Sequence, residues 1–130
     1  MREDIGLFRG KRLDNGEWVE GYLSCEKIGG YLTNVFIVEN IHGDVWERHR
    51  VDPATVGEYT GLKDKNGKRI FEGDVLEDGF GNRAKVVYGD WNCGCCYSVY
   101  GWTADGRCDL APSWQKVVGN IVDNPELLEV

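Results

Sequence analysis

Apolar and polar residues alternate with a period of two along much of the chain, which is typical of β-strands with one buried face. The segments IGLFRGKR and EWVEGYL flank the turn-forming LDNG, and YLTNVFIVENI and DVWERHRV flank HG. Each arrangement predicts a hairpin. In the last segment Glu47 and His49 share one face with two valines, while Trp46, Arg48 and Arg50 share the other. Because neither face is cleanly apolar, we expect an exposed edge strand.

Residues 52–61, with the sequence DPATVGEYTG, interrupt this alternation. Asp52 predicts the cap of one helical turn that has Pro53 at its first position. We interpret 52–61 as a joint between an N-terminal β unit, residues 1–51, and a C-terminal unit, residues 62–130. A chain of this length could also form one compact domain.

The second half of the chain predicts several short strands in the segments RIFEGDVLED, RAKVVYGDW, YSVYGW and QKVVGNIV. Short strands separated by turns every 8 to 12 residues or so are typical of a small barrel. The tail DNPELLEV predicts a helical turn with Asn124 as its cap and Pro125 at its first position. We therefore expect a mostly β protein, in which an N-terminal hairpin unit packs on a C-terminal barrel and a short helical turn ends the chain.

The stretch GLKDKNGKR, from Gly61 to Arg69, resembles a phosphate-binding loop only superficially. Asn66 stands where the second glycine of such a loop belongs, and no helix is predicted after it. The order Lys65-Asn66-Gly67-Lys68 predicts a type I′ hairpin turn instead. The cations of the stretch could still contact an anion.

Of the 130 residues, 42% are hydrophobic and 28% are charged, a composition typical of a globular protein. Its net charge of −7 disfavours nucleic-acid partners, because acidic groups repel the phosphate backbone. The longest apolar run is VFIV, and the N-terminus MREDIGLFRGKR lacks the apolar segment of a secretory signal. We therefore expect a cytoplasmic protein with no membrane association.

The segment NCGCC contains the spacing of a metal knuckle, with Cys93 and Cys96 as the pair and Cys108 twelve residues further on. A structural zinc site normally has two clear ligand pairs, and here there is one pair and a single residue. Free thiols are the favoured interpretation in a reducing compartment. A zinc-supported module that uses Cys93, Cys96 and Cys108 is the alternative.

Two long motifs, EYTGLKDKNGKRIFEGDVL and VVGNIVDNPELLEV, together with the short element FRGK, are similar to the YopX family of small phage and prophage proteins. The resemblance covers nearly the whole chain and implies an all-β fold with an SH3-like barrel in the C-terminal half. It carries no established activity, and NCGCC lies outside the family pattern. The positions that match the family are mostly turn formers: Tyr59, Thr60, Gly61, Lys63, Asp64, Asn66, Gly67, Glu72, Gly73, Asp74, Gly119, Asn120, Asn124 and Pro125.

We therefore expect a non-enzymatic phage or prophage accessory protein that binds a host or phage protein in the bacterial cytoplasm and needs no cofactor. We assign no catalytic residue. An alternative is a nucleic-acid-binding barrel that uses its aromatic residues and the basic stretch 61–69, and mimicry of DNA by the acidic surface is a weaker one. The expected contact residues are Trp46, Arg48, Arg50, Lys63, Asp64, Lys65, Asn66, Lys68 and Arg69.

Overall fold

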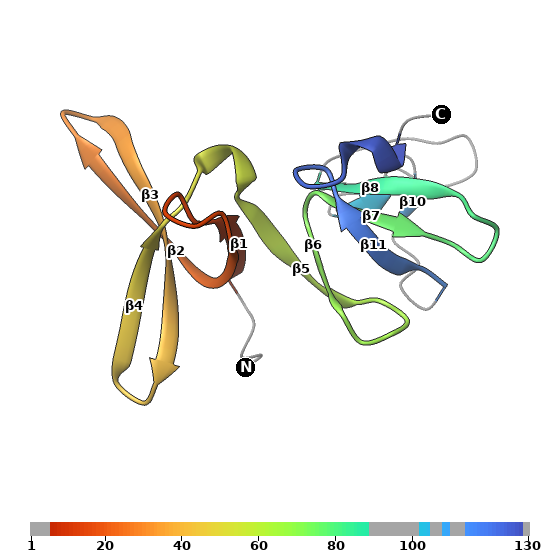
Figure 1. The fold of residues 1–130 in the computed structure, drawn as a ribbon, viewed down its shortest axis with the longest axis horizontal. Helices are drawn as coiled ribbons and strands as arrows, with labels where there is room; N and C mark the ends of the chain where they lie inside the picture. Colours follow the sequence, from red (N-terminus) through yellow and green to blue (C-terminus); the bar gives the residue numbers. More distant parts are fainter. Residues whose placement is uncertain (1–5, 89–101, 105–107, 110–113, 129–130) are drawn as a thin grey trace. The chain divides into compact units, whose positions relative to one another are not determined.

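The computed structural model describes residues 6–88, 102–104, 108–109 and 114–128, and these form two antiparallel sheets (Figure 1). The expectation of a mostly β fold is confirmed. The chain divides into two compact units, residues 1–59 and 60–130. The predicted joint, 52–61, contains a 3₁₀ turn and the first part of strand β5 (Gly57–Lys63).

The first sheet has six strands in the order β4-β3-β2-β1-β5-β6, which places β4 at an edge as the sequence predicts. Five of the six residues of β4 are exposed. The strands that precede β5 are β1 (Leu7–Lys11), β2 (Trp18–Ile28), β3 (Tyr31–His42) and β4 (Val45–Arg50).

Both predicted hairpins of the N-terminal unit are formed, by β1 with β2 and by β3 with β4. A third hairpin, which we did not predict, joins β2 to β3. Its closing pair, Ile28 and Tyr31, encloses Gly29 and Gly30, whose φ angles are 61° and 85°. A Gly-Gly pair with two positive φ angles suits a tight two-residue turn, so the sequence KIGGYL contained the signal.

One face of the N-terminal sheet covers a small core of Val19, Val35, Ile37 and Val51, against which Phe8 packs. The opposite face remains exposed over much of its area. This unit therefore has one buried and one solvent-facing side, as antiparallel sheets often do.

The C-terminal sheet has the order β10-β9-β8-β7-β11. Four strands follow one another as a meander, and β11 returns beside β7 with a bulge between Val117 and Gly119. A closed barrel is not confirmed, because β10 and β11 are the two ends of this sheet in the part of the chain that the structure describes. The strands of the C-terminal unit are β6 (Arg69–Phe71), β7 (Asp74–Glu77), β8 (Arg83–Tyr88), β9 (Trp102–Ala104), β10 (Cys108–Asp109) and β11 (Lys116–Asn120). Ile70, Leu76 and Val86 form its core.

Both predicted helical turns are present, as η1 (Pro53–Thr55) and η2 (Pro125–Leu128). Asp52 caps η1, because its side chain accepts a hydrogen bond from the N–H of Ala54 at 3.0 Å. Asn124 directly precedes η2, and its Oδ1 accepts a hydrogen bond from the N–H of Asn120 at 3.4 Å. Asn124 therefore links the turn before η2 to the end of β11.

Candidate interaction surface on the N-terminal sheet

The solvent-facing side of the N-terminal sheet carries aromatic and cationic side chains from four strands. Arg48 is paired with Val38, and Val38 is also paired with Tyr22. Because directly opposed residues point to the same face, side chains far apart in the sequence gather here. We call this side the aromatic–arginine face and define it by Arg9, Lys11, Trp18, Glu20, Tyr22, Glu26, Phe36, Val38, Trp46, Arg48 and Arg50.

Two large rings form the exposed apolar part of this face. The ring centroids of Tyr22 and Trp46 lie 6.1 Å apart with the planes tilted by 46°, a favourable geometry for an aromatic pair. Tyr22 remains 42% exposed and Trp46 50% exposed. The two rings therefore contact each other and still offer a large area to a partner.

Arginine side chains lie over the neighbouring rings. The guanidinium carbon of Arg48 is 4.0 Å from the centroid of Phe36, which is buried beneath it. The guanidinium carbon of Arg9 is 4.7 Å from the centroid of Trp18. Such stacking holds each planar cation in place and leaves its N–H donors directed outward, which suits recognition of carboxylates.

The charge of this face differs in sign from that of the whole chain. The chain carries a net charge of −7. The face has more cations than acids, and Arg48 is bridged to one of those acids, Glu26, at 3.3 Å. Its cations are Arg9, Lys11, Arg48 and Arg50, and its acids are Glu20 and Glu26. The face is thus locally positive on an acidic protein.

The hairpin of β2 and β3 extends beyond the rest of this sheet (Figure 1). Among the described residues, β2 pairs with β3 alone from Leu23 to the tip, because its pairing with β1 ends at Tyr22. Ile28 is 69% exposed and Tyr31 79% exposed. An isolated two-stranded ribbon is only marginally stable in water. Two exposed apolar side chains at such a tip are well placed for contact with another molecule.

The stretch from Gly61 to Arg69 forms a hairpin turn, but one residue earlier than the predicted type I′ turn. The closing hydrogen bond runs from the N–H of Gly67 to the carbonyl of Asp64 at 3.0 Å, so Lys65 and Asn66 are the central residues. Gly67 follows with a φ of 82°. The prediction of a hairpin was right and its turn type was wrong, because the side chain of Asp64 stabilises the longer loop.

Asp64 lies inside this turn and is 7% exposed. Its Oδ1 accepts hydrogen bonds from the N–H groups of Asn66 and Lys68 at 2.8 and 2.9 Å, and its Oδ2 accepts one from Val117 at 2.8 Å. Burial acts to raise the pKa of Asp64, but the backbone donors of Val117, Lys68 and Asn66 outweigh it and lower the pKa below its ordinary value.

The predicted contact residues thus fall into three groups. Asp64 is committed to the turn and to β11. Trp46, Arg48 and Arg50 belong to the aromatic–arginine face, which also contains residues that we missed, above all Tyr22 and Phe36. The alternation of side chains along a strand was the available signal for Tyr22 and Phe36. It could be used only once the pairing of β2, β3 and β4 was known. The remaining predicted residues are exposed on or beside the turn: Lys63, Lys65, Asn66, Lys68 and Arg69.

Asp74, another acid of the matched motifs, also has a structural partner. It is 1% exposed, and its Oδ2 accepts a hydrogen bond from the N–H of Phe71 at 2.8 Å. The proposed zinc ligands Cys93 and Cys96 lie outside the described residues, as does the side chain of Cys108. In the described part of the chain, no helix has the length and hydrophobicity needed to cross a membrane.

The fold and this surface define a small all-β protein with an exposed aromatic and cationic sheet face. A family model described as YopX protein matches residues 7–129, and the chain therefore belongs to the YopX family. The chain is also similar to the crystal structure of protein EF1440 from Enterococcus faecalis, with 25% sequence identity and a TM-score of 0.52. That match covers 94% of this chain and 96% of the other. No curated protein matches.

Proposed function

We propose that this protein is a non-enzymatic phage or prophage accessory protein that acts in the bacterial cytoplasm by binding another protein through its aromatic–arginine face. The observation that supports this most is the Tyr22–Trp46 ring pair, which is half exposed beside the stacked Arg48. Tryptophan, tyrosine and arginine are enriched among the few residues that carry most of the binding energy in protein interfaces.

The chemistry of the face suggests the chemistry of the partner. Two exposed rings favour an apolar patch that covers them, and the surplus of arginine and lysine favours carboxylates around that patch. We therefore propose a protein partner with acidic side chains bordering an apolar depression. A whole chain with a net charge of −7 would be repelled by a uniformly acidic polymer such as DNA.

Two buried carboxylates of the matched motifs are used structurally, which argues against a catalytic role for them. Asp64 and Asp74 both accept backbone hydrogen bonds inside turns, which is a structural use of these acids.

For the C-terminal unit we propose an SH3-like barrel. The meander with a returning last strand favours this proposal.

Affinity capture with variants of the two candidate surfaces tests the proposal. The baits are the wild-type protein, the Trp46→Ala/Arg48→Ala variant, and the Lys65→Ala/Lys68→Ala variant as a matched control on the turn. Cells that carry the phage or prophage supply the prey, and quantitative mass spectrometry measures recovery. We expect the wild type and the turn variant to recover the same protein, and the face variant to lose it by about tenfold or more.

Two results would contradict the proposal. Equal recovery of the partner by all three baits would remove the face from recognition. A low-salt gel shift with single-stranded DNA, duplex DNA or RNA that disappears in the face variant would assign the same surface to nucleic acid. Thermal unfolding of each variant shows whether a loss of binding reflects a loss of fold.

A further inference from the structure

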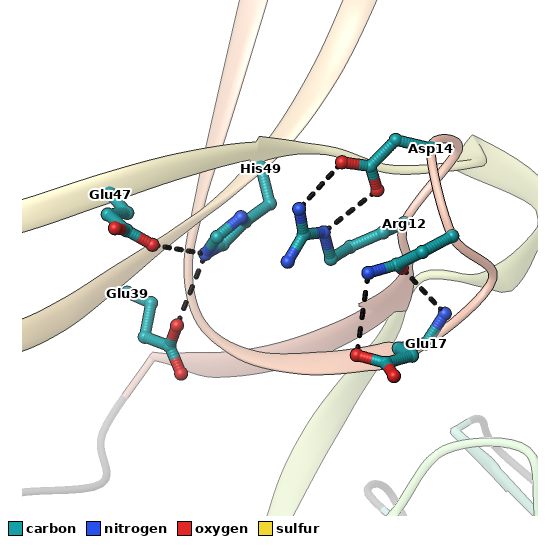
Figure 2. A network of polar contacts seen from close by, with 7 residues as sticks. Arg12, Asp14, Glu17, Glu39, Glu47 and His49 are labelled. Carbon is teal, nitrogen blue, oxygen red and sulfur yellow. Dashed lines mark hydrogen bonds and ion pairs between the residues drawn. The ribbon is translucent and has the colours of Figure 1, made fainter.

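Three potential metal ligands meet on the β3–β4 hairpin (Figure 2). They lie on the face that covers the core, at the place where this face becomes exposed to solvent. Glu39 of β3 is directly paired with Glu47 of β4, so their side chains share a face. His49 lies two residues along β4 from Glu47 and therefore points to that same face. All three side chains are held by regular strands and not by a loop.

The distances in this cluster suit a metal ion. Nε2 of His49 is 3.1 Å from Oε1 of Glu39 and 3.6 Å from Oε2 of Glu47. One ligand atom from each of the three residues lies within 4.8 Å of the others. Ligands that are each ~2.1 Å from zinc lie about 3.0 to 3.4 Å apart at octahedral or tetrahedral angles. Small side-chain rotations would bring the three atoms to these separations.

The burial of the three residues is uneven. The side chain of His49 is 8% exposed, whereas those of Glu39 and Glu47 are 40% and 57% exposed. A buried imidazole is held in one orientation, and its Nε2 points toward the two carboxylates in Figure 2. The open side of the glutamates would let water complete the coordination of an ion and let that ion exchange.

The charges at this position also favour a cation. Two glutamates directly opposed on one face repel each other. The nearby Arg12 is held by Asp14 through hydrogen bonds of 2.9 and 2.6 Å, and Figure 2 shows its guanidinium directed toward Asp14. The hydrogen bond to Asp14 is the largest of the causes that raise the pKa of Arg12, followed by the charges of Asp14 and Glu17, and the charge of Glu47 is the smallest. Arg12 is therefore paired mainly with Asp14 and offsets little of the repulsion between the glutamates.

We propose that Glu39, Glu47 and His49 bind one divalent metal ion, and that this ion is zinc. One imidazole nitrogen with two carboxylate oxygens is a set of ligands that zinc accepts readily, whereas magnesium prefers oxygen ligands alone. The ion would join the edge strand β4 to β3. The proposal is independent of the proposed function, although Trp46 and Arg48 alternate with these ligands on the same strand.

Nuclear magnetic resonance of the imidazole nitrogens tests the site directly, because the chain has only 2 histidines. The full chain is freed of metal with a chelator, labelled with ¹⁵N and titrated with zinc chloride. We expect zinc to shift the ring signals of His49, with His42 as an internal reference that does not respond. This readout is specific for histidine, so zinc that binds to the cysteines does not obscure it.

Variants define the ligands. We expect Glu39→Gln/Glu47→Gln to weaken the zinc response of His49 by at least about tenfold. Glu47→Gln alone serves as a milder variant, and Glu72→Gln removes an exposed acid elsewhere as the matched control. Amide spectra of the metal-free variants show whether they are folded. The proposal is overturned if His49 does not respond to zinc, if magnesium produces the same response, or if the folded double variant responds like the wild type.

Discussion

Val117 donates a backbone hydrogen bond to the carboxylate of Asp64 at 2.8 Å, although the two residues are 53 positions apart. This bond joins the turn after β5 to strand β11. The other oxygen of Asp64 accepts from Asn66 and Lys68 within the turn. One buried side chain thus stabilises both the local turn and the closure of the C-terminal unit.

Replacement Asp64→Asn should destabilise the protein. An amide retains one acceptor oxygen but turns its NH₂ group toward backbone donors, so at least one buried N–H loses its partner. We expect a loss of about 2 kcal/mol in the free energy of unfolding, measured with urea at neutral pH. Asp78→Asn is a suitable control, because Asp78 makes similar bonds to Phe80 and Asn82 in an exposed turn. An equal loss in both variants would contradict a special role for Asp64.

The lowered pKa of Asp64 predicts a dependence of stability on pH. Because the folded-state pKa is below the unfolded value, the unfolded state binds the proton more readily. The contribution of Asp64 is complete above the unfolded pKa of about 4 and is lost as the pH falls through the lower, folded pKa. Urea unfolding between neutral and strongly acidic pH should show a smaller acid-induced loss in Asp64→Asn than in the wild type. If the free energy of unfolding fell equally with pH in the variant and in the wild type, this prediction would be contradicted.

Replacement Gly21→Ala should disrupt the N-terminal sheet. A Cβ atom at Gly21 would overlap the backbone carbonyl of Val38 and contact the Ile37 side chain. Backbone cannot move aside without breaking the pairing of β2 with β3, so we expect a loss of about 3 kcal/mol or more in urea unfolding. Gly79→Ala is the matched control, because a Cβ there meets nothing within 4 Å. A neutral Gly21→Ala variant would show that this strand register is wrong.

The contact between Tyr22 and Trp46 should be measurable as a coupling energy. A double-mutant cycle with Tyr22→Ala and Trp46→Ala should give about 0.5 to 1.5 kcal/mol of interaction in the free energy of unfolding. Tyr31 is exposed at the far end of the β2–β3 hairpin, so a cycle of Tyr31→Ala with Trp46→Ala should give no coupling. Equal coupling in the two cycles would exclude a direct ring contact.

Local signals were sufficient for much of the fold. The LDNG and HG turns predicted their hairpins, Asp52-Pro53 predicted η1, and the mixed faces around Trp46 predicted an edge strand. The Gly29-Gly30 hairpin had an equally clear signal that we did not use. The turn near Asp64 was misassigned by one residue, because Asn66-Gly67 suits two turn types. The hydrogen bond from the N–H of Asn66 to the Asp64 side chain stabilises the one that forms.

The candidate sites needed the pairing of strands. Trp46 and Arg48 were predicted as contacts from one strand alone, whereas Tyr22, on a different strand, became their neighbour only through the register of β2 and β3. The approach of Glu39 to His49 has the same origin. Alternation along a strand states which residues share a face, but it contains no information about which strand lies beside it.

The sequence by itself determined the mostly β character, the turns, the caps and membership of the YopX family, because each depends on residues that are close together in the chain or match over its length. The tertiary structure alone decided that Asp64 would bind Val117 and that cations would gather on one face of an acidic protein. The physical reason is that contacts between distant residues depend on strand register and burial. A single strand is compatible with several registers and neighbours, and the packing of the whole fold selects one of them.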